Sequence, residues 1–425
     1  MVKKLLISYI IILLFAGCNE DPVIDANVSI EMDEISENAE TICTIGTEDT
    51  ILIGLPEEVL DVNIVWESNR DLLQGFVKDI IAQDEFIYVF GTQMDVGPVP
   101  EAYEQYLSGD GESIHKYLPA PLYYRDNNAF INYYQNNGEQ INIEIINSSQ
   151  QDYIAQIDSV GEQVFVKIES TNQHEQRIIN TIISINNLML EYIVDSSRKF
   201  GFLLLLDGKI YEYFSDYDTG EKYSAVYEIL NNCLTLKSYF WAPLVDFGKI
   251  IGSTLLGMNI FLDGFEIDIE GTTFTETKMV FENSLFDSPH LFDADINSER
   301  NYFLSYLGRE SEHVGFFWGA YDRGTDPLFY YLLSDSVELT NLYVVDNGFF
   351  ITGQEDGKML LIFLNHDGEI QWKAHFREGI LRGIAEYNSR YFIAGDYNIR
   401  VTDDPLDWGS DYLYLAEIDL ELMDN

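Results

Sequence analysis

The hydrophobic positions of this chain fall in short stretches. From about residue 51 to the end, short runs rich in Ile, Val, Phe, Tyr and Leu alternate with breaks of Gly, Asn and Asp. No window carries the sustained 3.6-residue periodicity of an amphipathic helix, and residues 101–118, the best helical candidate, are interrupted at 108–111. The pattern therefore predicts many β-strands joined by turns.

The turn residues support the same prediction. A type I′ turn needs a positive φ at both central residues, which favours Asn-Gly and Asp-Gly pairs. The pair Asp207-Gly208 separates the apolar run 202–206 from 209–214, which indicates a hairpin. Further pairs lie at Asn137-Gly138, Asp263-Gly264, Asn347-Gly348, Asp356-Gly357 and Asp367-Gly368. Six such pairs indicate antiparallel sheets, so we expect an all-β fold.

A repeat is visible along the chain. Gly353 and Gly395 each end an aromatic–Ile run, and a similar run ends at Gly91. Comparable runs lie at 129–134, 164–168, 202–206, 248–252 and 302–308. Eight such strands give a period of about 43 residues, which is typical of propeller blades. We therefore expect residues 51–425 to form a single β-propeller of seven or eight blades, with paired β-sandwiches as the alternative.

One segment carries a family resemblance. The sequence Asp367-Gly-Glu-Ile-Gln-Trp372 resembles the turn and tryptophan of blades in quinoprotein-like and related secreted bacterial propellers. The resemblance implies that Trp372 packs between blades. Trp66 ends a weaker copy that has Val62 at the glycine position. Quinone enzymes of that superfamily use an adjacent-cysteine disulfide, and no Cys-Cys pair exists here, so quinone binding is not implied.

The N-terminal residues predict export. Lys3 and Lys4 precede the apolar run 5–16, the layout of a signal peptide too short to span a bilayer comfortably. Phe15-Ala-Gly-Cys18 resembles the lipobox of bacterial lipoproteins, which implies cleavage after residue 17 and a lipid on Cys18. The alternative is an ordinary signal peptide with Cys18 near the cut. Polar residues 18–50 then form a lipidated tether.

The lipobox implies a location in the cell envelope, with the lipid anchoring the chain to the outer membrane. The acidic tag Asn19-Glu20-Asp21 resembles signals that send some lipoproteins to the outer surface. The membrane, through the lipid, is thus the first expected partner.

Charge excludes one class of partner. The chain has 72 acidic against 24 basic residues and a formal charge of −48, spread along its length. Such a field repels phosphate backbones, so we expect no nucleic-acid binding. With 46% hydrophobic residues the chain can still bury a large core. Cys43 and Cys233 are buried thiols or form one disulfide.

Local motifs for catalysis are missing. The six histidines form no zinc-ligand spacing, no GxSxG elbow or phosphate-binding glycine loop occurs, and His366 is expected to be a solvated loop residue. No motif assigns a cofactor. Calcium is the one metal suggested, because acids alternate at Asp293-Ala-Asp295-Ile-Asn297 and at Asp216-Tyr-Asp218-Thr-Gly-Glu221. Neither segment completes a calcium loop.

We therefore expect a non-catalytic, lipid-anchored envelope propeller that binds a protein or glycan partner. The alternative is a surface enzyme on glycans, hydrolase or lyase, that uses acids and tyrosines at the propeller mouth. Two carboxylates about 5–10 Å apart in a deep, aromatic-lined pocket would favour the enzyme. A shallow mouth with scattered acids would favour the binding protein.

Overall fold

All regular secondary structure in the described residues is β-strand, which confirms the all-β prediction. The structure is a computed structural model. It describes residues 39–45, 50–71, 75–83, 86–95, 126–146, 151–160, 163–172, 177–184, 188–194, 198–206, 209–216, 222–230, 233–241, 245–251, 254–259, 263–268, 274–281, 289–296, 300–309, 312–322, 327–333, 337–399 and 410–420. Cys18 and the N-terminal signal lie outside them. The described part contains no helical segment with the length and apolar character needed to cross a bilayer.

The strands form seven sheets. Sheet A contains β1(Ala39–Ile45), β16(Phe247–Ile251), β17(Thr254–Met258), β18(Gly264–Asp268) and β19(Phe274–Phe281). Sheet B contains β2(Thr50–Ile53), β20(Pro289–Ile296), β21(Arg300–Arg309), β22(Glu312–Asp322) and β23(Pro327–Leu333). Sheet C contains β24(Val337–Val345), β25(Gly348–Glu355), β26(Lys358–Leu364) and β27(Ile370–Glu378).

Four further sheets complete the set. Sheet D contains β3(Asn63–Asp71), β28(Ile380–Tyr387), β29(Arg390–Ile399) and β30(Ser410–Asp419). Sheet E contains β4(Gly75–Gln83), β5(Phe86–Asp95), β6(Asp126–Gln135) and β7(Gln140–Ile146). Sheet F contains β8(Gln151–Val160), β9(Gln163–Asn172), β10(Arg177–Ser184) and β11(Leu188–Val194). Sheet G contains β12(Arg198–Leu206), β13(Lys209–Asp216), β14(Lys222–Leu230) and β15(Cys233–Trp241).

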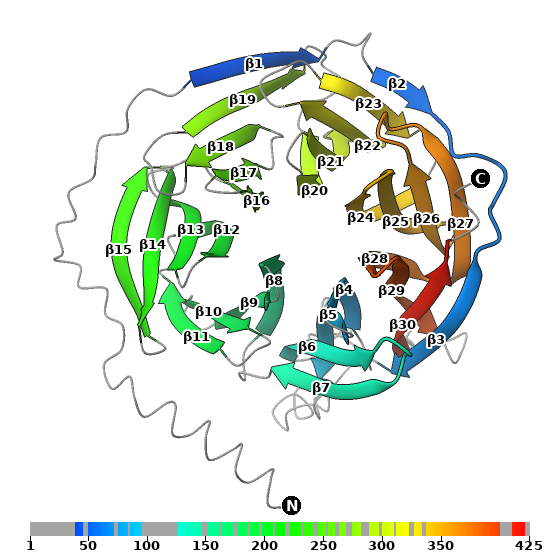
Figure 1. The fold of residues 1–425 in the computed structure, drawn as a ribbon, viewed down its shortest axis with the longest axis horizontal. Helices are drawn as coiled ribbons and strands as arrows, with labels where there is room; N and C mark the ends of the chain where they lie inside the picture. The colour runs from blue at the N-terminus through cyan, green and yellow to red at the C-terminus, as the bar shows by residue number, and fades with distance from the viewer. Residues whose placement is uncertain are drawn as a thin grey trace, which may run out of the picture.

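The sheets are arranged in a ring, a propeller-like architecture and not two packed pairs of sheets (Figure 1). Within each sheet, strands that follow one another in the chain pair antiparallel, and the strands β4, β8, β12, β16, β20, β24 and β28 lie nearest the centre of the ring (Figure 1). Apolar clusters fill the space between neighbouring sheets, including B with C, C with D, and D with E. The core is thus divided among sheet interfaces.

Two strands far apart in the sequence pair in sheet D. The strand β3, from near the N-terminus, pairs antiparallel with β30, from near the C-terminus. Before β3, the chain runs along the outside of the ring: β1 adds parallel to β19, β2 adds parallel to β23, and Leu60 bridges to Ala374 of β27 (Figure 1). Residues 39–45 and Thr50 are therefore part of sheets, although we expected a tether up to residue 50.

The repeated glycines occupy equivalent places. Gly91, Gly353 and Gly395 lie in the second strands of sheets E, C and D, each opposite a bulge in the first strand. A Cβ at these positions would come within 2.3, 2.0 and 2.3 Å of a backbone carbonyl oxygen of that first strand. Glycine is required because the bulge brings the two backbones together.

The expected count of eight repeat strands was too high. The runs ending near Gly91 and at Tyr134 lie in neighbouring strands, β5 and β6, of one sheet. A long segment between these two strands, residues 96–125, gives them the spacing of separate repeats. The runs 202–206 and 248–252 belong to first strands, whereas 164–168 and 302–308 belong to second strands as expected.

The turn predictions met mixed outcomes. Asp356 and Gly357 have φ values of 52° and 77°, which confirms a type I′ hairpin. Gly138 and Gly368 have positive φ at the ends of longer turns, where their N–H groups bond to the carbonyls of Gln135 and Asn365.

The other three pairs differ. Asp346 and Asn347 form the β24–β25 turn, so Gly348 already belongs to β25. Gly264 is paired with Met258, which makes the β17–β18 connection longer than two residues. The pair at 207–208 lies outside the described residues.

The tryptophan expectation is confirmed. Trp372 packs with Phe350 and Phe363 against the apolar cluster that joins sheets C and D. Trp66 occupies the matching place in sheet D: it contacts Phe392 and lies directly against Gly138 of sheet E.

Candidate functional site

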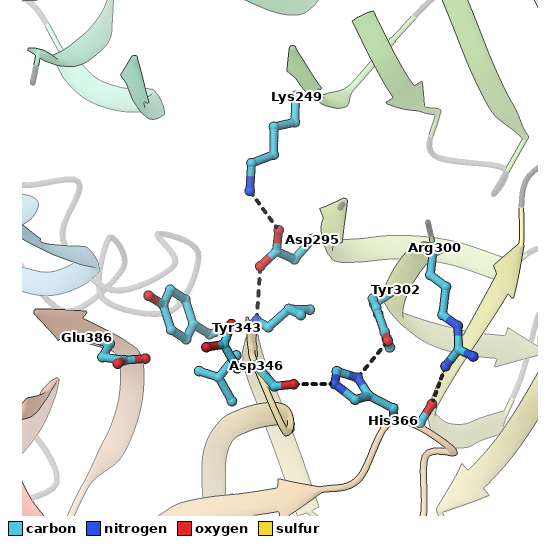
Figure 2. A pocket seen from close by; sticks show the side chains of 10 residues that line it. Lys249, Asp295, Arg300, Tyr302, Tyr343, Asp346, His366 and Glu386 are labelled. Atoms are coloured by element: carbon cyan, nitrogen blue, oxygen red, sulfur yellow. Dashed lines mark hydrogen bonds and ion pairs between the residues drawn. The ribbon is translucent and has the colours of Figure 1, made fainter. Parts of the chain in front are cut away.

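A polar pocket opens where four consecutive sheets meet at one face of the ring. It has a volume of about 620 Å³. Its lining residues are Lys249, Asp295, Arg300, Tyr302, Tyr343, Val344, Val345, Asp346, His366 and Glu386, contributed by sheets A, B, C and D (Figure 2). The volume falls in the range of small-molecule sites in proteins.

Hairpin geometry places these residues together. Asp295 lies one residue before the end of the innermost strand of sheet B, Asp346 lies in the turn after the innermost strand of sheet C, and Glu386 lies near the end of the innermost strand of sheet D. Equivalent strands in a ring present their ends to the same face, so residues about 40 to 90 positions apart converge. His366 joins them from the β26–β27 turn.

His366 is held in one orientation by hydrogen bonds at both ring nitrogens. Its Nε2 lies 2.8 Å from the carbonyl oxygen of Asp346, and its Nδ1 lies 2.8 Å from the hydroxyl of Tyr302 (Figure 2). A carbonyl only accepts, so Nε2 carries the proton; in the neutral ring Nδ1 then accepts from Tyr302. His366 lies in a turn, as expected, but its ring is only partly exposed and is bound to protein partners.

Arg300 fixes the same turn. Its guanidinium donates to the backbone carbonyl of His366 at 3.1 Å (Figure 2). Tyr302, only 1% exposed, holds the histidine ring from the same strand. The turn of sheet C that carries His366 is thus held by two residues of sheet B, and this wall of the pocket is preorganised.

Asp295 links three sheets. Its Oδ2 accepts the backbone N–H of Val344 at 2.9 Å, and its Oδ1 lies 3.8 Å from Nζ of Lys249 (Figure 2). Lys249 reaches over from sheet A and is 59% exposed, so this ion pair is weak. The backbone hydrogen bond is the stronger attachment of this carboxylate.

The pocket floor is electrostatically negative. Burial, together with the charges of Glu386 and Asp295, raises the pKa of Tyr343 to about 12. Burial also raises the pKa of Tyr391 to about 12, again with the charge of Glu386, to which its hydroxyl is hydrogen-bonded. Both phenols therefore stay protonated at neutral pH.

Two further acids lie on the inner strands. Removal from water raises the pKa of Asp293 to about 8, and the charge of Asp79 contributes; burial raises the pKa of Asp79 itself to about 6. Asp293 accepts the backbone N–H of Leu342 at 2.6 Å and that of Ala294 at 2.9 Å. It therefore joins sheet B to sheet C, as Asp295 does two residues later.

These hydrogen bonds give the alternating acids of residues 293–297, suggested above as calcium ligands, a structural role. Asp293 and Asp295 alternate because they lie on one face of β20, and both accept backbone N–H groups of β24. Asn297, Asp218 and Glu221 lie outside the described residues. Within the described ranges, no group of three or more His, Cys, Asp or Glu side chains is arranged to hold a metal ion.

No family model and no curated protein sequence matches this chain. Similar solved structures include the europium-containing methanol dehydrogenase, at 10% identity and TM-score 0.45, covering 84% of this chain and 93% of that one. The β-propeller domain of the Trilobed protease from Pyrococcus furiosus has 11% identity and TM-score 0.40, covering 76% and 91%. A chain of the mitotic checkpoint complex has 10% identity and TM-score 0.42, covering 92% and 97%. These scores are too low for any of the three to indicate what this chain does.

Proposed function

We propose that this chain is a lipid-anchored protein of the cell envelope, built as a single seven-bladed β-propeller, that binds a glycan or protein partner without catalysis. The pocket shared by sheets A to D is its binding site. The seven sheets around one centre support the blade count. The signal-like residues 1–17 and Cys18 support the lipid anchor at the outer membrane.

The observation that carries this proposal is that two pocket residues fit for acid–base chemistry, His366 and Asp295, are bound to protein partners. Both nitrogens of His366 are occupied by protein partners, and Asp295 is bonded to a backbone N–H. A general base must be able to reach a substrate proton. Asp293, whose pKa burial raises to about 8, is bound to two backbone N–H groups instead of lining the pocket. This favours binding over hydrolysis or lysis of a glycan.

Binding is tested with the full chain purified in detergent, against immobilised envelope glycans and envelope proteins. Asp346→Arg puts a large cation at the exposed turn beside the pocket, and Glu378→Arg makes the same charge change at the opposite end of sheet C. We expect a ligand of the parent protein to be lost with the first substitution and kept with the second. Equal binding by both variants, the absence of any ligand, or cleavage of a bound glycan would contradict the proposal.

The anchor is tested separately. Cys18→Ser removes the thiol that would take the lipid, so we expect the protein to move from the membrane fraction to the soluble envelope fraction. Radiolabelled fatty acid should label the parent chain and not the variant. Unchanged membrane association of the variant would show that the lipid is not the anchor.

A further inference from the structure

The donors and acceptors of the pocket are unequally available. The hydroxyl of Tyr302 donates to His366, the Nε2 proton of His366 goes to Asp346, and Arg300 donates to the main chain of residue 366 (Figure 2). The most exposed donor of the lining is Lys249, which is 59% exposed and only 3.8 Å from Asp295. One donor each of Tyr302, His366 and Arg300 is therefore directed at the protein.

Acceptors, in contrast, remain open. The side chain of Asp346 lies in an exposed turn, and the hydrogen bond from His366 goes to its main-chain carbonyl, which leaves the carboxylate for a ligand. Glu386 has one hydrogen bond, from Tyr391, and a carboxylate has about four acceptor sites. Both carboxylates line the same cavity of about 620 Å³ with Tyr343.

The open carboxylates suit some ligand groups better than others. A neutral sugar hydroxyl can donate one hydrogen bond to these carboxylates but brings no charge. An ammonium brings three donors and no acceptor, so it satisfies carboxylates without leaving its own groups unpaired. The ring of Tyr343 adds an aromatic surface of the kind that attracts cations and also packs on sugar rings.

We propose that the pocket binds a glycan through a protonated primary amine, held by Glu386 and Asp346 beside Tyr343. This inference rests on the proposed function, because it names the ligand class of the same site. The cavity is much larger than an ammonium, so the amine belongs to a larger polar body such as an amino sugar.

The experiment compares two oligosaccharides of one length: glucosamine oligomers with free amines, and their N-acetylated counterparts, which lack the charge. Calorimetry on the full chain in detergent at pH 6.5 should show the amine form binding at least about tenfold more tightly, the worth of one charge-assisted hydrogen bond. Its affinity should fall with added salt.

Variants locate the contact. Glu386→Gln keeps the shape and a hydrogen-bonding oxygen for Tyr391 while removing the charge, and should weaken the amine form about tenfold. Glu378→Gln is the matched control at the far end of sheet C and should leave binding unchanged. Circular dichroism and melting temperature verify that both variants fold.

The outcomes separate the two proposals. Equal affinity for both oligosaccharides, or an unchanged affinity in Glu386→Gln, overturns the proposal that the pocket recognises an amine and leaves glycan binding in place. Binding of other glycans or proteins, but of neither oligosaccharide, also overturns amine recognition and leaves the proposed function in place. A parent chain that binds no glycan and no envelope protein overturns the proposed function as well.

Discussion

At the scale of single residues, the fold strongly changes the pKa of the Asp293 carboxyl group. It links two sheets through backbone N–H groups, and burial raises its pKa to about 8. The folded protein therefore holds this proton more tightly than the unfolded chain, where the pKa is about 3.9. Its contribution to stability is fully present below about pH 4 and is lost as pH rises through about 8.

Asp293→Asn removes this titration and keeps a carbonyl oxygen for the N–H of Leu342. We expect the free energy of unfolding to fall less between pH 5 and pH 9 in the variant than in the parent, by roughly 1 kcal/mol or more. Urea unfolding at the two pH values measures the difference.

Asp79→Asn provides the companion measurement, because the charge of Asp79 raises the pKa of Asp293. That variant should move the midpoint of the parent's pH transition to lower pH. Identical pH dependence in the parent and in Asp293→Asn would show that Asp293 does not titrate in this range.

Tyr302 and His366 form a second residue-scale unit. Tyr302→Phe deletes the hydroxyl that donates to Nδ1 of His366 and leaves that nitrogen without this partner. We expect a loss of about 1–2 kcal/mol in the free energy of unfolding. Nitrogen NMR should show His366 of the parent protonated at Nε2; a proton at Nδ1 at neutral pH would contradict the assigned hydrogen bonds.

At the scale of elements, the β28–β29 hairpin has a turn that lacks the glycine by which such turns are recognised in a sequence. Asn388 and Ser389 have φ values of 53° and 61°, the type I′ geometry, although no glycine marks it. Ser389 is exposed, so its side chain has no packing role to lose. Ser389→Gly should therefore stabilise the fold by about 0.5–1 kcal/mol, since glycine adopts positive φ without steric cost.

The matched control is Gly357→Ala in the β25–β26 turn, where φ is 77° and nothing lies within 4 Å of an added Cβ. Its cost should come from the backbone alone and be similar in size with opposite sign. Chemical denaturation of both variants gives the comparison, and destabilisation by Ser389→Gly would refute the strain assigned to this turn.

The elements also show what a sequence can and cannot predict. Trp372, Gly353 and Gly395 were recognisable because each repeats a local requirement: a ring between sheets, or a backbone approach at a bulge. The hydrogen bonds of His366 and Asp293 could not be predicted, because their partners, Tyr302 and Leu342, lie 64 and 49 residues away in the sequence. Spacing within one strand says which face a side chain lies on, but it does not name the neighbour across a sheet interface.

At the scale of the whole molecule, the ring depends on one junction between distant parts of the chain. β3, nine residues long, and β30, ten residues long, pair antiparallel through eight residue pairs. Every other sheet has its four inner strands in continuous chain order. Opening of the β3–β30 pairing is thus a way for the ring to separate without first breaking a hairpin.

A disulfide across this junction tests its importance. Asn63 and Asp419 are paired residues at its end, and cysteines there would close a loop of about 360 residues, worth up to about 6 kcal/mol by chain entropy. Cysteines at the paired positions Lys358 and Glu378, within sheet C, would close a loop of about 20 residues and give about 3 kcal/mol. We expect the oxidised junction variant to gain more stability over its reduced form than the oxidised sheet C variant does. A larger gain in sheet C would mean that the two chain ends stay paired until the blades themselves unfold.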